Sequence, residues 1–364
     1  MPRMLNIREL ARLAKVSPGA ASLALRGRPG VSEETRQRVA RIAAEHGYRP
    51  NPMVTALMSQ VGTRLRRRVE SIVGILSYMD LAHYPVHSTP HLYLQGINRA
   101  AEGAGYLVEN FTLSLTAGEE PAPLSRMLDA RCIRGLLLHI KPEDFDQLAI
   151  DKNRFAFVAL GVPINAGAVD FVCNDHSHSV QLAVQNLLRL GYRRIGLALD
   201  GKRPEHAASA MLAAMLAWQF RAVPVDSPVG GKSIPPLVGA DWSPATLIAW
   251  YRREKPDAII CSDHLALDWL RDAGIRIPDD GRDSRPGGKR NGRRDGVAFA
   301  HIDLDPGWKG IAGIDQCNDQ VGAAAMDLLI SLLNANRYGL PAHPRTVKLQ
   351  GEWHDGATAP PVRR

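Results

Sequence analysis

The chain has 364 residues, of which 45% are hydrophobic and 23% are charged. This composition is typical of a globular protein with a sizeable core, and it excludes collagen-like, mucin-like and wholly disordered chains. The net charge of +8 is concentrated in residues 1–70, which hold 14 Lys/Arg against 5 Asp/Glu, whereas the remainder holds 31 against 32. A basic segment joined to a neutral remainder indicates a nucleic-acid-binding head, although charge alone equally allows a solvated basic arm.

The sequence contains no apolar stretch of signal-peptide kind and no run of 18 apolar residues, so we expect a soluble chain that stays in the cytoplasm. The four cysteines stand singly, without metal-ligand spacing, which favours buried structural thiols over a zinc site. Metal binding is also disfavoured at His83, His87 and His91, which are spread over a Pro-rich stretch. We expect no metal and no cofactor.

Three short helices are expected within the first fifty residues. The first begins at Asn6, because Glu9 three residues later completes a capping-box pattern. The second begins at Ser17, with Pro18 in the first helical position, where its missing N–H costs nothing. The third takes Ser32 as its N-cap and is followed by two glutamates in its first turn.

Two short helices separated by a few residues, with small side chains near the crossing, are the pattern of a helix-turn-helix. In that motif the second helix lies in the major groove, with its N-terminal residues at the base edges. The residues that this arrangement turns toward DNA are Pro18, Gly19, Ser22, Leu23 and, at the far end of the helix, Arg26. An ordinary three-helix bundle is the alternative that the pattern leaves open.

A further short helix is expected after the turn cluster at 47–52, with Asn51 as its cap. Leu57 on this helix is followed by an arginine-rich stretch at 64–68. A helix too short to be stable alone folds against a partner, and an apolar side chain beside arginines is the composition of a minor-groove wedge. A linker helix packed on the rest of the chain is the alternative.

Residues 5–60 resemble the DNA-binding head of the lactose/galactose repressor family of bacterial transcription regulators. The stretches that carry the resemblance are NIRELARLAKVS, VSEETRQRVARIAAEHGYRPN and the hinge segment ending in Ala56-Leu57. The resemblance assigns DNA backbone contacts to Ser17, Ser32, Thr35, Tyr48 and Asn51, and base contacts to Pro18, Gly19 and Ser22. It places Leu57 where the family's hinge leucine intercalates at the operator centre. Asn6 and Thr55 complete the set of DNA-binding candidates.

The recognition helix departs from the family, which usually has T-V-S-R where this chain has Ala20-Ala21-Ser22-Leu23. The missing arginine is the residue type best suited to bidentate contact with guanine. Readout of the operator is then expected to depend on DNA shape and on Arg26 or Arg28, so no operator sequence can be borrowed from a relative.

The rest of the chain alternates short apolar runs with helical stretches. The expected strands are Ile72–Leu76, Tyr106–Phe111, Ile133–His139, Phe155–Leu160, Ile195–Leu199, Ala222–Val225, Ala258–Cys261 and Val297–Ile302. The expected helices are Leu92–Gly103, Ser177–Leu190, Pro204–Phe220, Pro244–Arg253, Leu265–Ala273 and Asp319–Asn334. This alternation predicts parallel sheets with helices on both faces, and about 280 residues favour two α/β lobes over one.

The family resemblance is weaker here and rests on GYRRIGLAL, on CSDHLALDWLRDAGIRIPDD, and on IAGIDQCNDQVGAAAMDLLISLL followed by GEWHDGAT. It implies a periplasmic-binding-protein-like body that holds a small ligand, such as a sugar or a related metabolite, in the cleft between its lobes. It also implies dimerisation through lobe faces. In that topology the chain crosses between the lobes more than once, so each lobe is discontinuous.

Asp175 and Asp263 each follow an apolar strand, at the strand end where α/β sheets bind ligands. A carboxylate there can accept hydrogen bonds from two neighbouring sugar hydroxyls, but both residues also precede helices and can equally serve as N-caps. The family's ligand-binding arginine has no counterpart in residues 205–218, which leaves Arg203 as a poor substitute and puts the standard sugar-type effector in doubt.

The expected domains are a helix-turn-helix head at 1–50, a hinge helix and basic linker at 51–70, a two-lobed effector-binding and dimerisation body at 71–352, and a tail at 353–364. The basic stretch 279–295 is expected to form a solvated surface loop, with a second DNA or anion contact as the less favoured alternative. The final residues, from 357, are expected to be disordered.

The sequence has no complete enzyme motif among those considered. The stretch Gly230-Gly231-Lys232-Ser233 lacks the first glycine of a phosphate loop, since position 226 is Asp, and prolines follow where a helix is needed. We therefore predict a sequence-specific DNA-binding regulator, a repressor in preference to an activator and not an enzyme. It is expected to bind a near-palindromic double-stranded operator as a homodimer, to respond to an effector in the cleft and to have no membrane partner. The alternative is a cleft-binding module with only non-specific DNA affinity.

Overall fold

The computed structural model describes residues 7–25, 30–45, 71–113, 124–161, 168–201, 204–222, 233–239, 241–278, 296–305 and 307–362. The chain divides into two compact units, Met1–Glu70 and Ser71–Arg364, called the head and the body below. The expected hinge helix around Leu57 and the basic stretch 279–295 lie outside the described residues. Within these described ranges, no helix is both long and apolar enough to cross a membrane.

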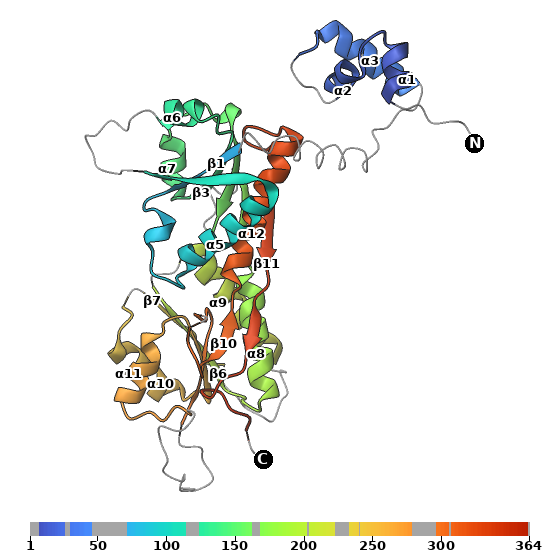
Figure 1. Ribbon diagram of the computed structural model, residues 1–364. Helices are drawn as coiled ribbons and strands as arrows, with labels where there is room; N and C mark the ends of the chain where they lie inside the picture. The colour runs from blue at the N-terminus through green and yellow to red at the C-terminus, as the bar shows by residue number, and fades with distance from the viewer. Residues whose placement is uncertain are drawn as a thin grey trace. The chain divides into compact units, whose positions relative to one another are not determined.

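The described part of the head consists of three short helices, α1 (Ile7–Leu13), α2 (Pro18–Leu25) and α3 (Glu33–Glu45) (Figure 1). Their inner faces are small and apolar, because Leu10, Ala14, Ala21 and Val39 are fully buried against one another. Small side chains at the crossing allow α1 and α2 to approach closely. The three helices begin where the capping patterns in the sequence predict them.

The N-terminal lobe of the body is built on a parallel sheet of strand order β11-β5-β4-β3-β1-β2. Its strands are β1 (Ser71–Ser77), β2 (Tyr106–Thr112), β3 (Gly135–His139), β4 (Ala156–Leu160), β5 (Asp170–Asn174) and β11 (Thr346–Leu349). Helices α5 (Thr89–Ala104) and α12 (Asn318–Ala335) cover one face of this sheet, and α6 (Leu124–Ala130) and α7 (Pro142–Gln147) cover the other. Short 3-10 turns lie at Leu81–His83 and Lys152–Arg154.

The C-terminal lobe has a second sheet, of order β12-β10-β9-β8-β6-β7, in which β12 alone runs antiparallel to its neighbour. Its strands are β6 (Ile195–Asp200), β7 (Leu237–Gly239), β8 (Ala258–Cys261), β9 (Ala298–His301), β10 (Ala312–Asp315) and β12 (Glu352–His354). Helices α8 (His176–Arg189) and α9 (Glu205–Ala222) cover one face, and α10 (Pro244–Glu254) and α11 (Leu265–Asp272) cover the other. The prediction of a two-lobed α/β body with parallel sheets is thus confirmed.

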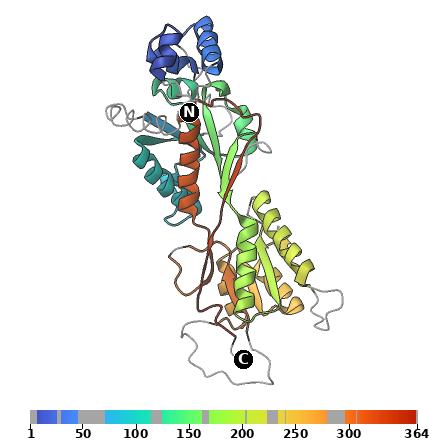
Figure 2. The same cartoon turned by 90° about the vertical axis from the view of Figure 1, so that its right-hand side faces the viewer.

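The chain passes between the lobes three times, from β5 to α8, from β10 to α12 and from β11 to β12 (Figure 2). The first and third connections are joined by a hydrogen bond from the backbone N of Asp175 to the carbonyl of Leu349, at 2.7 Å. The second and third lie so close that a Cβ on Gly351 would stand 2.5 Å from the carbonyl oxygen of Asp315. The three connections therefore form one joint, and each lobe is assembled from separate stretches of chain.

The C-terminal residues are packed, so the expectation of a disordered tail is wrong for residues 357–362. Thr358 and Ala359 are only 2% and 3% exposed. The Thr358 hydroxyl donates to the carbonyl of Phe299 at 2.7 Å and accepts from the backbone N of Ala312 at 2.9 Å. This segment lies beside the starts of β9 and β10, where Thr358 makes polar contacts and Ala359 joins the hydrophobic core of the lobe. Residues 357–362 form no helix or strand, so no periodic pattern predicted their packing.

Two smaller expectations also need correction. The strand expected at 222–225 begins with Ala222, which instead ends α9, and its other residues lie outside the described part of the chain. Cys173 and Cys261 are buried, and burial raises the pKa of their thiols to about 11 and about 12. Cys132, by contrast, is exposed, and Cys317 is half-buried.

Candidate DNA-binding head and interlobe site

Ser17 caps the second helix of the head. Its Oγ accepts a hydrogen bond from the backbone N of Ala20 at 3.1 Å, and Pro18 occupies the first helical position. Ser17, Pro18 and Gly19 are all exposed, so this end of α2 is open to a partner. A hydroxyl that accepts from the helix can still donate its own proton, and a DNA phosphate requires such a donor.

Ser32 has the same position at the start of α3. Its Oγ accepts from the backbone N of Thr35 at 3.3 Å, and the two hydroxyl oxygens are 2.9 Å apart. Glu33 in the first turn pairs with Arg36 at 2.7 Å. Both serines that the family resemblance assigns to the DNA backbone therefore also stabilise a helix start.

The exposed face of α2 is poor in polar side chains. The helix reads PGAASLAL, without a charged or amide residue. Leu23 is half-buried, and its Cδ1 lies 3.6 Å from where a Cβ on Gly30 would stand, so one side of Leu23 contacts the connection to α3. Shape and backbone contacts then carry more of any DNA recognition by this helix than hydrogen bonds to bases.

Several predicted site residues lie outside the described part of the chain: Asn6, Arg26, Tyr48, Asn51, Thr55, Leu57 and Arg203. Ser22 lies within α2, where only its backbone is described. For these residues the predicted contacts stay predictions.

The body offers a second candidate site where its lobes meet. Asp175 stands at the N-cap of α8, where its Oδ1 accepts from the backbone N of His178 at 3.1 Å. Asp263 accepts from Trp242 Nε1 at 2.6 Å and from the backbone N of Leu265 at 2.9 Å. Asp175 thus makes the N-cap contact that the sequence left open as an alternative to ligand binding, whereas Asp263 precedes the N-cap of α11, His264, and bonds to the first helical residue.

An aromatic cluster near Asp263 was not predicted from the sequence. Trp308, on the loop after β9, has its ring centre 4.9 Å from that of His301 and 5.3 Å from that of His264. The neighbouring Gly307 approaches the N-terminal lobe, because a Cβ there would lie 3.8 Å from His87 Cδ2. Applying the strand-end rule to β9 would have found His301, but Trp308 follows seven residues later and has no local signal.

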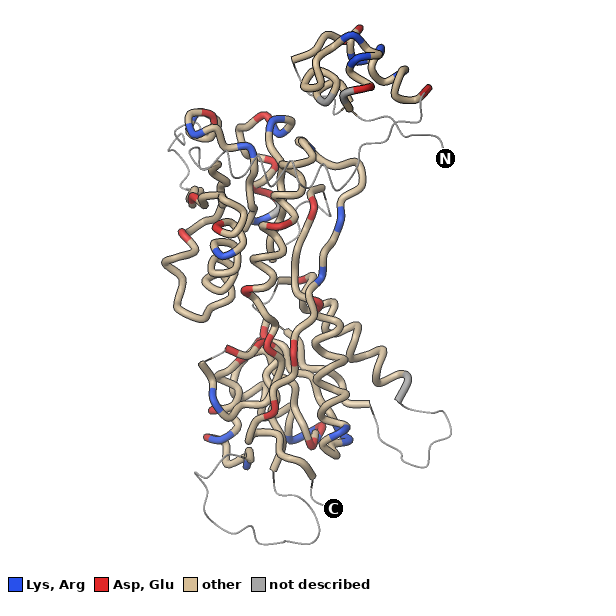
Figure 3. The backbone as a smooth tube through the Cα atoms, turned by 45° about the vertical axis from the view of Figure 1, so that its right-hand side comes forward, with Lys and Arg blue, Asp and Glu red and all other residues tan. Residues whose placement is uncertain are grey.

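Carboxylates predominate at the strand ends that meet between the lobes (Figure 3). Described acidic residues that end these strands or follow them closely include Asp80, Asp175, Asp200, Asp241, Asp263, Asp303, Asp305 and Asp315. The described cations in the same stretches are Lys141 and Lys309. The charge of the described residues at these strand ends is therefore net negative, which favours neutral or cationic ligands over anions.

The N-terminal lobe contributes a half-buried histidine to this region. His139 ends β3, with its Nδ1 3.3 Å from the carbonyl oxygen of Leu160 and its ring edge-on to Tyr93. Burial lowers the pKa of His139, against the smaller opposing effect of the Leu160 carbonyl. The ring is therefore held neutral in the folded chain at neutral pH.

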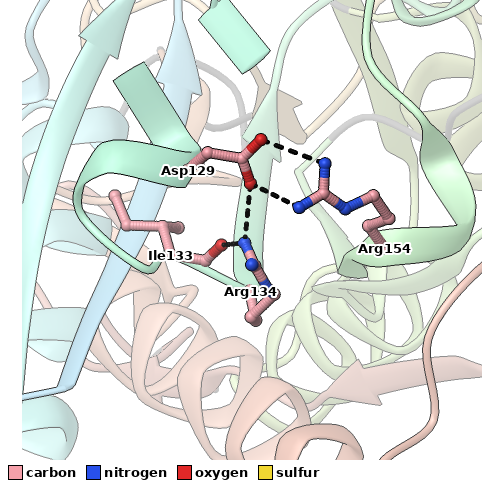
Figure 4. Close-up of polar contacts among 4 residues, drawn as sticks. All are labelled: Asp129, Ile133, Arg134 and Arg154. Carbon is pink, nitrogen blue, oxygen red and sulfur yellow. Dashed lines mark hydrogen bonds and ion pairs between the residues drawn. The ribbon is translucent and has the colours of Figure 1, made fainter. Parts of the chain in front are cut away.

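Two arginines lie at the opposite end of the same sheet, just before the first residues of β3 and β4 (Figure 4). Asp129, near the end of α6, accepts from Arg154 at 2.7 and 3.0 Å and from Arg134 at 3.1 Å. The Arg134 guanidinium also donates to the carbonyl of Ile133 at 2.8 Å. This cluster fastens α6 to the strand starts, and because its side chains are more than a third exposed it contributes only about 1 kcal/mol or less per pair.

Comparison with known proteins matches both units. Residues 6–51 match the bacterial regulatory proteins of the lacI family, and residues 184–281 match the periplasmic binding protein-like domain. An uncharacterized HTH-type transcriptional regulator in the aml 5' region of Streptomyces limosus is 31% identical over 211 residues, which are 56% of this chain. The match spans about half of that relative, 54% of its length.

Two solved structures cover nearly the whole chain. The transcriptional regulator CelR in complex with cellobiose has a TM-score of 0.56 at 18% identity, over 97% of this chain and 99% of that one. The lac repressor dimer bound to operator and the anti-inducer ONPF has a TM-score of 0.53 at 17% identity, over 98% and 100%. At these identities the two structures show the shared fold.

A helix-turn-helix head joined to a two-lobed periplasmic-binding-protein-like body defines a class of bacterial transcription regulators. The head of the chain matches the lacI family within that class, as its residues indicated, and part of the body matches the periplasmic binding protein-like domain. The curated relatives that it matches are HTH-type transcriptional regulators.

Proposed function

We propose that the protein is a sequence-specific repressor that binds a near-palindromic operator as a homodimer. The observation that carries the proposal is the open N-terminal end of α2, where Ser17, Pro18 and Gly19 are exposed on a head that matches the lacI family. Two heads related by a twofold axis read two half-sites of opposite orientation. Leu57 of each hinge segment enters the minor groove between them and unstacks a base step.

A small molecule between the lobes modulates this binding. The carboxylates at the strand ends accept hydrogen bonds from hydroxyls, and Trp308 offers an aromatic surface near His264 and His301. We therefore infer a neutral polyol such as a sugar, or an organic cation, in preference to a phosphorylated effector. The effector shifts the arrangement of the lobes, and operator affinity changes by its differential affinity for the two arrangements.

Selection of binding sites from random duplex DNA tests the proposal. The expected result at roughly physiological salt, where non-specific phosphate contacts are weak, is enrichment of a site with twofold symmetry. Absence of enrichment, with the dimer intact and with sugars present or absent, would refute it. The chain would then be a ligand-binding module whose head has only non-specific DNA affinity. The test includes this alternative because α2 has no charged or amide side chain that could read bases.

Leu57→Ala tests the wedge on the selected site. Specific affinity should fall by about tenfold or more, because a base step is no longer held open, while the melting temperature stays unchanged. Leu65→Ala is the matched control, since it makes the same change eight residues later and beyond the stretch that resembles the family's hinge. Equal effects of the two variants on specific affinity would mean that the segment around Leu57 acts only as a linker.

The effector class is tested with matched sugars by thermal shift. Neutral disaccharides and amino sugars are expected to raise the melting temperature by mass action, whereas their phosphate esters are expected to have no effect. Stabilisation by the phosphate esters alone would contradict the assignment, because it requires an excess of cations, whereas carboxylates outnumber Lys141 and Lys309 at the described strand ends.

A further inference from the structure

Three polar side chains are buried where the lobes join. Asn174, Gln316 and Asn318 are 5%, 1% and 4% exposed, and each lies at the C-terminal end of a strand or at the connection that follows it. Burying an amide without hydrogen bonds is costly, so the partners of these side chains show which parts of the joint hold each other.

Most of these hydrogen bonds end on the backbone of the connections themselves. Asn174 Nδ2 donates to the carbonyl of Gln316 at 2.8 Å, and Gln316 Nε2 donates to the carbonyl of Ile302, also at 2.8 Å. Together with the bond from Asp175 to Leu349 they hold the strand ends in fixed register. Contacts of this kind move with the backbone to which they are attached.

The contact between Asn318 and Asp303 differs because it joins two side chains from different lobes. Asn318 Nδ2 donates to Asp303 Oδ1 at 3.3 Å, while Asn318 Oδ1 accepts from Asn174 Nδ2 at 3.1 Å. Asn318 begins α12, which belongs to the N-terminal lobe, and Asp303 follows β9 in the C-terminal lobe. It stands on the loop that carries Trp308.

Helix α12 transmits any movement of Asn318 to the rest of its lobe. Its crossing with α5 leaves no room for a side chain, since a Cβ on Gly322 would lie 2.1 Å from the carbonyl oxygen of Tyr93. Tyr93 in turn donates from its hydroxyl to Asn174 Oδ1 at 3.4 Å. The helix pair therefore moves as one body with the first residue of α12.

We propose that the hydrogen bond from Asn318 to Asp303 is the contact that sets the angle between the lobes and is exchanged when that angle changes. It can lengthen by side-chain rotation while the backbone-anchored bonds of the joint stay intact. Its acceptor is a carboxylate oxygen of Asp303, which makes the hydrogen bond stronger than one between neutral groups. Losing it shifts the ratio of the two lobe arrangements by about tenfold. This inference rests on the proposed function in one respect, that the lobe arrangement controls operator binding.

An exchange of the two side chains provides the test. Asn318→Asp removes the donor and places two carboxylates together, and Asp303→Asn removes the charged acceptor. The double variant restores the contact in reverse, because an amide at 303 can donate to a carboxylate at 318 that still accepts from Asn174. An aspartate at the first position of α12 is favourable to the helix, so folding is preserved. Asp268→Asn, on an exposed face of α11, is the control for loss of a carboxylate.

Trp308 supplies the readout. All six tryptophans lie in the C-terminal lobe, and the difference between each variant and its Trp308→Phe derivative isolates the signal of Trp308. Acrylamide quenching of that signal should rise in both single variants of the full chain and return to the wild-type value in the double variant. Asp268→Asn should not change it. Unchanged quenching in the single variants, or failure of the double variant to restore it at an unchanged melting temperature, would overturn the proposal.

Operator affinity of the same variants separates this inference from the proposed function. If the single variants alter both quenching and affinity for the selected duplex, and the double variant restores both, the contact is the lobe switch. If quenching changes and is restored while affinity stays constant, the contact still sets the lobe angle, and its control of operator binding is refuted. If no duplex is selected at all, the proposed function fails while the quenching result still stands.

Discussion

Replacing Gly96 by alanine should separate two helices that pack almost backbone to backbone. A Cβ on Gly96 would stand 1.7 Å from the carbonyl oxygen of Asp319, whereas carbon contacts settle at about 3.5–4 Å, so α5 and α12 must part by roughly 2 Å. The side chains that lose contact are Val321, Met326 and Leu329, all fully buried. Their burial stabilises the lobe by about 6 kcal/mol in total, at about 2 kcal/mol each.

A gap of about 0.5–1 Å already forfeits up to about half of such contact energy, so the larger separation costs at least about 3 kcal/mol. Alanine in a helix regains about 1 kcal/mol over glycine, which leaves a net loss of at least about 2 kcal/mol. Gly103 in the same helix is the matched control, because a Cβ there meets nothing within 4 Å. Gly103→Ala should therefore stabilise α5 by up to about 1 kcal/mol. The two substitutions are expected to have opposite signs.

Hydrogen exchange measured by mass spectrometry on peptides from α5 and α12 is the appropriate assay, because it reports local opening in a chain with several units. A loss of about 2 kcal/mol corresponds to exchange about 30-fold faster in Gly96→Ala. Exchange in Gly96→Ala that is equal to or slower than in the wild type would refute the close crossing and the energy derived from it.

Three further outcomes are expected. Ser17→Ala removes the cap of α2 and should destabilise the head by about 1 kcal/mol in a denaturant titration, whereas Ser17→Asp, which keeps an acceptor, should not. Thr358→Val deletes the hydroxyl that joins Phe299 and Ala312 and should cost about 1–3 kcal/mol in thermal unfolding; a neutral result would mean that this segment is not packed. Because burial lowers the pKa of His139, protons bind the unfolded chain more tightly, so stability is fully present above the ordinary value of 6.5 and is lost as the pH falls below it. The melting temperature of His139→Gln should therefore fall less between pH 7.5 and 5.5 than that of the wild type, and parallel curves would contradict the assignment.

Local contacts were the predictable ones. The bonds from Ser17 to Ala20 and from Ser32 to Thr35 join residues three positions apart, so residue type and spacing were enough to place them. Six helices of the body, α5 and α8 to α12, were found for the same reason, since each joins an amphipathic repeat to a start or stop signal. The two short helices α6 and α7 were not predicted. The strands β11 and β12 were missed because they are short and largely exposed, which removes the apolar run by which strands are recognised.

The contacts in the joint between the lobes could not be predicted from the sequence, for a different reason. Asn174 and Gln316 bond to each other across 142 positions, and neither is distinguished by its neighbours. The role of Asp175 could not be decided from the sequence, because its residue type and position allowed both a helix cap and a ligand contact. The observed bond to His178 shows the first role and leaves the second as a proposal.

The interleaving of the two lobes has a consequence for biosynthesis. The N-terminal lobe needs α12 and β11, which are encoded after every strand of the other lobe except β12. As the chain emerges, the sheet built from β1 to β5 lacks the helix that supplies Val321, Met326 and Leu329 to its core. Long-range pairing of this kind is slow and leaves apolar surface uncovered in the meantime. Chains that end before residue 318 should therefore be held by chaperones or aggregate, and both lobes reach their native state nearly together, once α12, β11 and β12 have been synthesised.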